Sequence, residues 1–99
     1  MRVTVAKLKR LNACSEQVRL FAELFFDGVD VTEALCVAHA DKFDWDWAAR
    51  HLLPAPLLVD YKAKRAPLWA DYLAEDEALW ADYVTKCAAL FGRLAEQVK

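Results

Sequence analysis

A five-residue motif recurs every 11 residues in the second half of this 99-residue chain. Its copies lie at 57–61, 68–72 and 79–83, and the last two both read Leu-Trp-Ala-Asp-Tyr. Leu90-Phe91 keeps the same spacing once more. Eleven residues are close to three turns of an α-helix, at about 3.67 residues per turn, so successive copies return to one side with a slight right-handed drift. Repetition at this spacing therefore predicts helix over 55–99.

The predicted helix carries an apolar arc about 160° wide when its residues are placed about 100° apart. The arc consists of two adjacent rows, and it is broader than the seam of a two-stranded coiled coil. The first row is Leu68, Tyr72, Leu79, Tyr83, Leu90 and Leu94, and the second is Trp69, Leu73, Trp80, Val84, Cys87 and Phe91.

The length of such a helix is hard to reconcile with a small domain. One helix over 57–98 would be about 63 Å long at 1.5 Å per residue, whereas a compact domain of this size has a radius of gyration of about 13 Å. Pro67 could kink the helix, because proline removes a backbone hydrogen bond and clashes with the preceding turn. Either the helix breaks again, near Gly92, or a second chain covers the rest of the arc. The sequence favours a long or kinked helix that a partner covers.

The first half of the chain has the start and stop signals of short helices. Ser15, Thr32 and Asp44 are predicted N-caps, while Asp27-Gly28 and Pro54 are predicted stops. Residues 2–5 alternate like an extended arm, although a short helix ending near Asn12 fits equally well. With only 2 Gly and 3 Pro, a β-sandwich is disfavoured.

We therefore expect one all-α domain over 1–99. Three or four short helices in 1–54 would pack as a cap on 55–99, which forms a long helix, kinked or straight, or a helical hairpin.

Charge is unevenly distributed along a chain whose net charge is −2. The first ten residues contain four bases and no acid, whereas 71–85 contain five acids and no base. Solvated helix faces are the simplest interpretation. Alternatively, chains associate head to tail, or the acidic surface binds a basic partner. The bases are Arg2, Lys7, Lys9 and Arg10, and the acids are Asp71, Glu75, Asp76, Glu77 and Asp82.

Compartment is predicted from the cysteines and the apolar runs. Cys14, Cys36 and Cys87 are odd in number and widely spaced, which favours reduced thiols in the cytoplasm. Neither a signal peptide nor an apolar run long enough for a transmembrane helix is evident, so we expect no membrane association.

No constellation for catalysis or cofactor binding emerges from the sequence. Cys36-x-x-His39 has a spacing that zinc ligands use, but no second pair completes a site, and no third group would orient a Cys–His nucleophile. Two glycines are too few for a phosphate-binding loop. A basic cluster at 62–65 precedes an acidic run that opposes nucleic acid. We therefore expect a non-enzymatic protein without metal or cofactor that does not bind nucleic acid.

The repeat instead supplies candidate residues for binding another protein. Trp69 and Trp80 lie one repeat apart, about 16 Å along a helix, and exposed tryptophans are typical of interface hot spots. Packing against the short helices is the simpler interpretation, and a stripe that binds a partner helix or a second copy is the functional one. The candidate partner-binding residues are Trp69, Asp71, Tyr72, Glu75, Asp76, Trp80, Asp82 and Tyr83.

The order of motifs resembles that of small uncharacterised proteins encoded by phages, prophages and bacterial genomes, over Val3 to about Leu94. The shared motifs are Ala13-Cys14-x-x-Gln17, Phe21-x-x-x-Phe25, Val31-Thr32-Glu33, Asp44-x-x-Trp47-Ala48-Ala49 and Asp60-Tyr61, followed by 11-residue Ala/Trp/Tyr repeats. This chain departs from the pattern in its later repeats, which lack the proline, and the last also lacks Asp-Tyr. The resemblance implies an accessory protein of a mobile element and supplies no site residues.

Two functions are predicted on this basis. The first is a phage or mobile-element inhibitor that binds a host defence complex in the host cytoplasm, in the manner of anti-CRISPR proteins. The alternative is a self-associating scaffold that forms a homodimer through the 11-residue-repeat helix.

Overall fold

The computed structural model describes residues 1–75 and 79–98, which form six α-helices and one two-stranded sheet. The chain is thus mostly helical, in agreement with the predicted all-α class. In chain order the elements are β1 (Arg2–Val3), α1 (Val5–Arg10), α2 (Ser15–Leu24), β2 (Val29–Asp30), α3 (Glu33–Ala38), α4 (Trp45–Leu52), α5 (Ala55–Ala74) and α6 (Trp80–Ala95).

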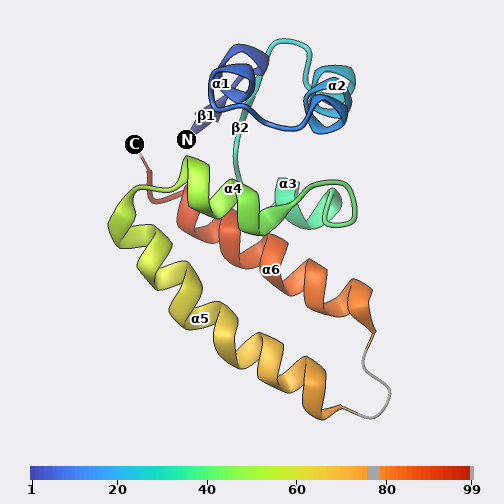
Figure 1. Ribbon diagram of the computed structural model, residues 1–99, viewed down its shortest axis with the longest axis vertical. Helices are drawn as coiled ribbons and strands as arrows, with labels where there is room; N and C mark the ends of the chain where they lie inside the picture. Colours follow the sequence, from blue (N-terminus) through green and yellow to red (C-terminus); the bar gives the residue numbers. More distant parts are fainter. Residues whose placement is uncertain (76–78, 99) are drawn as a thin grey trace.

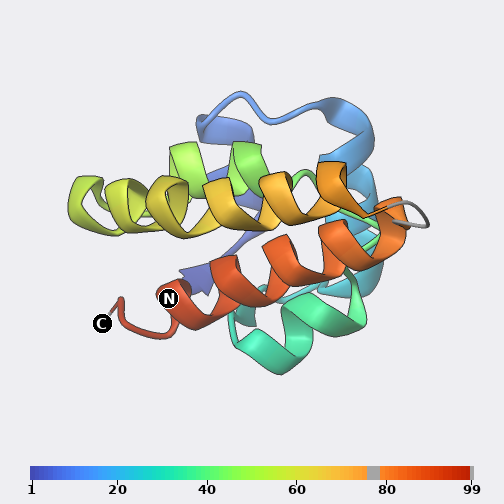
Figure 2. The same cartoon turned by 90° about the horizontal axis from the view of Figure 1, so that it is seen from below.

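The repeat region contains two helices and not one. α5 and α6 run antiparallel, side by side, as Figures 1 and 2 show, and they pack on each other. α5 ends because Glu75 has extended backbone angles (φ −81°, ψ 129°), and Leu79 before α6 is extended as well (φ −101°, ψ 128°). A continuous helix over 57–98 is therefore wrong.

Neither of the two predicted break points interrupts a helix. Pro67 lies inside α5 on its exposed side, and the helix continues for seven residues beyond it, to Ala74. Gly92 is buried within α6. A Cβ atom on Gly92 would lie 2.7 Å from Glu33 Cα and 2.8 Å from Thr32 O, so this glycine allows the backbones of α3 and α6 to approach closely.

The hairpin lets the two apolar stripes cover each other. The expectation of a second chain depended on a single long helix with too much uncovered surface, and that argument no longer holds. α6 is more buried than α5, and it contacts α3, α4 and α5. Its buried residues are Tyr83, Cys87, Ala88, Leu90, Phe91, Gly92, Leu94 and Ala95.

The first residues form both structures that the sequence offered as alternatives, an extended arm and a short helix. Residues 2 and 3 pair antiparallel with Asp30 and Val29, and α1 follows at Val5. Asn12 takes the left-handed conformation (φ 61°) just past α1. The N–H groups of Asn12 and Ala13 then donate to the carbonyls of Lys9 (3.1 Å) and Leu8 (3.0 Å), a pattern that ends many helices.

Two of the three predicted N-caps are confirmed. Thr32 Oγ1 accepts from Leu35 N at 3.1 Å, and Asp44 Oδ1 accepts from Trp47 N at 3.0 Å. Ser15 is wrong as a cap, because it is the first residue of α2 and Cys14 precedes it without a side-chain capping bond. α4 ends at Leu52, just before Pro54, as predicted.

The molecule is elongated, with principal extents of 41 × 27 × 23 Å. α1 and α2 lie at one end of the long axis, while the end of α5 and the start of α6 lie at the other, beyond α3 and α4 (Figure 1). This arrangement leaves the end of the hairpin without a covering helix.

Candidate functional site

Four aromatic side chains meet where α5 ends and α6 begins. Trp69 and Tyr72 come from α5, and Trp80 and Tyr83 come from α6; we call them the aromatic quartet. Each ring contacts the other three, with centroid distances from 5.2 Å (Trp69–Tyr83) to 6.4 Å (Trp69–Trp80). They occupy equivalent positions in the two Leu-Trp-Ala-Asp-Tyr copies, so the motif packs against itself across the hairpin. Mostly tilted and edge-to-face pairs of this kind stabilise a protein by about 0.5–1.5 kcal/mol each beyond area burial.

The quartet is buried on one side and open on the other. Tyr83 is 7% exposed, whereas Trp69 is 39% and Trp80 57% exposed. Leu73 and Leu79, beside the turn, are more than 60% exposed. Tyr83 therefore belongs to the core and the two tryptophans reach the surface, while their binding of a partner stays a prediction. We call Trp69, Leu73, Leu79 and Trp80 the hairpin-end surface.

Carboxylates accompany this apolar surface. Asp71, Glu75 and Asp82 are exposed. Among residues 1–75 and 79–98, no cation forms an ion pair with any of the three. Asp76, the remaining predicted site residue, lies outside the residues that the structure describes. The end of the hairpin thus combines exposed rings with negative charge that is not neutralised by described side chains.

A groove of about 700 Å³ begins at Trp80 and Tyr83 and extends to the segment before α4. Three carboxylates line this groove that were not predicted from the sequence as binding residues: Asp41, Asp44 and Asp46. Their grouping in sequence gives a local signal, but only the packing of α4 on α6 brings them beside the quartet. The groove is thus lined by carboxylates, of which Asp41 pairs with Lys42 at 3.4 Å and Asp46 with Arg65 at 3.6 Å.

A polar chain beneath the quartet fixes its buried member. Tyr61 Oη donates to Asp46 Oδ1 at 2.9 Å, and Arg65 Nε lies 3.6 Å from the same oxygen. Arg65 Nη1 also donates to Tyr83 Oη at 3.1 Å. Burial, and then the charge of Asp46, raise the pKa of Tyr61, so its hydroxyl remains a donor at neutral pH. These contacts join α4, α5 and α6 and hold Tyr83 in place.

Arg65 therefore has a role that the sequence did not predict. It was grouped with Lys62 and Lys64 in a basic cluster that could contact phosphate. In the structure Arg65 is directed at Asp46 and Tyr83, and Lys64 pairs with Asp60 at 3.1 Å. Two of the three cations in this cluster thus have partners within the chain.

Cys36 and the possible metal ligands are the other groups that the sequence raised as candidates. Burial raises the pKa of the Cys36 thiol to about 12, with Glu96 and Glu33 adding to the effect, so it is protonated at neutral pH and is not an activated nucleophile. Within the described part of the chain, no group of three His, Cys, Asp or Glu residues could hold a metal ion. None of the described helices is both long enough and apolar enough to cross a bilayer.

No known protein family, curated protein or solved structure matches this chain. The resemblance to small phage-associated proteins therefore stays a prediction from the sequence, and the functional argument depends on the residues themselves.

Proposed function

We propose that this protein is a non-enzymatic binding module that contacts its protein partner through the hairpin-end surface. The observation that carries the proposal is the exposure of Trp69 and Trp80 on a framework of packed rings. Exposed tryptophans held in a rigid cluster supply large contact area at low cost in conformational entropy, which is what interface hot spots require. Leu73 and Leu79 extend the same apolar surface.

The charge around this surface indicates the chemistry of the partner. Asp71, Glu75 and Asp82 are exposed near the end of α5 and the start of α6, and no described cation forms an ion pair with them. A partner with a basic surface would be attracted to this region and oriented by it. Such surfaces are typical of proteins and complexes that bind nucleic acid.

We therefore propose that the partner is a host defence complex that binds nucleic acid, and that this protein inhibits it in the host cytoplasm. The acidic groove and rim support this choice, together with the sequence resemblance to phage-borne proteins. In this proposal the carboxylates occupy the basic surface that the complex offers to nucleic acid, in the manner of an anti-CRISPR protein.

Plaque formation by a targeted phage tests the inhibitor proposal. Bacteria that rely on a single CRISPR–Cas complex would produce this protein, and each type of complex would be tested in turn. We expect wild type to restore plaques against at least one complex and Trp80→Ala to lose that effect. Phe26→Ala is the matched control, because Phe26 is 85% exposed and does not belong to the hairpin-end surface. If no complex is inhibited, the inhibitor proposal is wrong.

A second candidate, a self-associating scaffold, is favoured by the distribution of charge along the molecule. Lys7, Lys9 and Arg10 lie on α1, at the opposite end of the long axis from the end of α5 and the start of α6 (Figure 1). Two copies could therefore pair through their repeat hairpins as a dimer, or associate head to tail with opposite charges in contact.

Light scattering over a wide concentration range distinguishes the two candidates. Self-association predicts a mass that rises with concentration and falls back to that of a monomer in Trp80→Ala but not in Phe26→Ala. Head-to-tail contact would also weaken at high salt, because the attraction between exposed charges is screened. A concentration-independent monomer would exclude the scaffold.

A further inference from the structure

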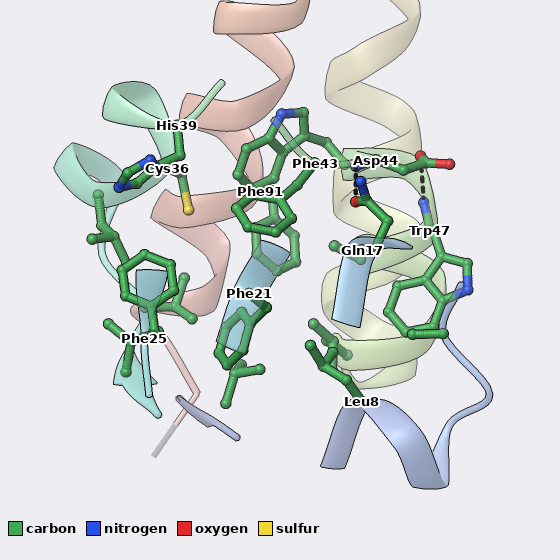
Figure 3. Close-up of a pocket in the computed structure, with 18 of the residues that line it drawn as sticks. Leu8, Gln17, Phe21, Phe25, Cys36, His39, Phe43, Asp44, Trp47 and Phe91 are labelled. Carbon is green, nitrogen blue, oxygen red and sulfur yellow. Dashed lines mark hydrogen bonds between the residues drawn. The ribbon is translucent and has the colours of Figure 1, made fainter. Parts of the chain in front are cut away.

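A second site lies at the other end of the molecule, between the first elements and the helices below them. It is a cavity of about 140 Å³ bounded by α1, α2 and the strand pair on one side and by α3, α4 and α6 on the other. Figure 3 shows the side chains that surround it. Six of the lining residues are aromatic: Phe21, Phe25, Phe43, Trp45, Trp47 and Phe91.

The size and polarity of the cavity restrict what it can hold. Apolar cavities of about 150 Å³ in other proteins stay dry and bind benzene. The walls here include no Lys or Arg, and the carboxylate of Asp44 lies at the rim. An anionic ligand would meet no positive charge, whereas an aromatic ring would pack edge-to-face against rings that already pack this way on one another.

One of the lining residues, His39, has a buried polar atom without a partner among the described residues. His39 Nδ1 is buried and makes no hydrogen bond with the described residues. The His39 ring lies edge-on to Phe25, with 5.3 Å between centroids. A buried unsatisfied nitrogen destabilises the protein, and a ligand hydroxyl would remove that cost. With its proton on Nε2, a neutral histidine can accept such a hydrogen bond at Nδ1.

We propose that this cavity is a binding site for a single-ring phenol. The ring occupies the space among the aromatic side chains, and the hydroxyl donates to His39 Nδ1. The ligand would contact both layers, so it would strengthen the attachment of α1 and α2 to the rest of the molecule. This site does not depend on the proposed function of the hairpin-end surface.

The entrance is near the contact between α2 and the segment before α4. Exposed Cys14 and Asp44 belong to the lining, which places this part of the cavity at the surface. Gln17 bridges the gap there, since its Nε2 donates to Lys42 O at 3.1 Å and its Oε1 accepts from Asp44 N at 3.2 Å. Figure 3 shows the Gln17–Asp44 bond at the edge of the site.

Titration of the full chain with phenol and with benzene, followed by ¹H–¹⁵N NMR, tests the proposal. We expect saturable one-to-one binding of both, tighter for phenol, with shifts concentrated at lining residues such as Val29 and Val31. His39→Phe keeps a ring but removes the acceptor, so phenol affinity should fall about tenfold towards that of benzene. Equal affinity of phenol in wild type and His39→Phe would overturn the role of His39. Absence of saturable binding would overturn the site.

Filling the cavity provides a second, independent test. Ala48→Leu adds volume at the wall and should abolish the binding of both probes, whereas Ala63→Leu makes the same change on the exposed side of α5 and should not. If Ala48→Leu does not fold, Leu8→Phe fills the cavity from the opposite wall. Undiminished binding in a folded filled variant would contradict the assignment. Trp80→Ala should bind phenol like wild type, because Trp80 is not one of the residues that line the cavity.

Discussion

At the scale of single residues, one amide side chain links two layers of the molecule. Gln17 on α2 uses both ends of its amide on the backbone that leads into α4, accepting from Asp44 N and donating to Lys42 O. α1 and α2 pack on each other, while α3 to α6 form the larger group of packed helices. The Gln17 side chain therefore supplies two hydrogen bonds that connect these groups of helices.

Gln17→Ala should lower the free energy of unfolding by about 1–2 kcal/mol, because two hydrogen bonds are lost, one of them part-buried and the other exposed. Urea denaturation measures the change. Gln97→Ala is the matched control, since the Gln97 side chain is exposed and makes no hydrogen bond with the described residues. A loss no greater than that of the control would mean that Gln17 does not connect the layers.

Buried thiol and phenol groups make the fold sensitive to alkaline pH. Burial raises the pKa of Cys36 from 9.0 to about 12 and also raises the pKa of Cys87 and of Tyr61. Below pH 9.0 the Cys36 thiol is protonated in both states, so its contribution to stability is fully present. Between 9.0 and 12 only the unfolded chain ionises there, and stability is lost.

In Cys36→Ala the free energy of unfolding should therefore fall less steeply as pH rises. The slope should differ from that of wild type by the equivalent of about one proton, which is roughly 1.4 kcal/mol per pH unit at most. Denaturation curves recorded as pH rises from 9.0 towards 12 test this. Cys14→Ala, at an exposed cysteine, should leave the slope unchanged. Identical slopes in wild type and Cys36→Ala would contradict the burial argument.

At the scale of elements, the sequence predicts the limits of the short helices better than the break between α5 and α6. The side chains of Thr32 and Asp44 each accept a hydrogen bond from the backbone N–H three residues further along the chain. Their capping roles can therefore be predicted from local sequence. The turn between α5 and α6 has no such local signal. Its residues include neither glycine nor proline, and the 11-residue spacing continues across it. The ends of α5 and α6 allow the two helices to pack on each other, a long-range contact that no local motif expresses.

Gly92→Ala tests the closest approach between two elements. In an exposed helix this exchange stabilises a protein by about 1 kcal/mol. At Gly92 the new Cβ would lie 2.7 Å from Glu33 Cα, so α3 must move and we expect a net loss of about 1–3 kcal/mol. Ala70→Gly, on the exposed side of α5, is the control and should cost about 1 kcal/mol through propensity alone. A Gly92→Ala variant more stable than wild type would contradict this packing.

At the scale of the whole molecule, the fold changes what the apolar repeat means. Most of the stripe is covered by α3, by α4 and by the packing of α5 on α6, and the uncovered part is concentrated at the end of the hairpin. The sequence placed Trp69 and Trp80 in one row, but it could not show that both meet Tyr72 and Tyr83 across a turn. It also could not bring Asp41 and Asp46 beside them, because that proximity depends on how α4 packs on α6.

Site-specific photo-crosslinking in cells that carry this protein tests the central claim most directly. A photoreactive residue would replace Leu73 in the hairpin-end surface or, as the matched control, Val59 near the other end of α5; the two are 63% and 68% exposed. We predict one discrete protein adduct from position 73, lost when Trp80→Ala is added, and none from position 59. An adduct containing two copies of this chain would identify the scaffold, and an adduct with another protein would identify the partner. No adduct at position 73, or equal adducts at both positions, would contradict the claim that the end of the hairpin is a protein-binding surface.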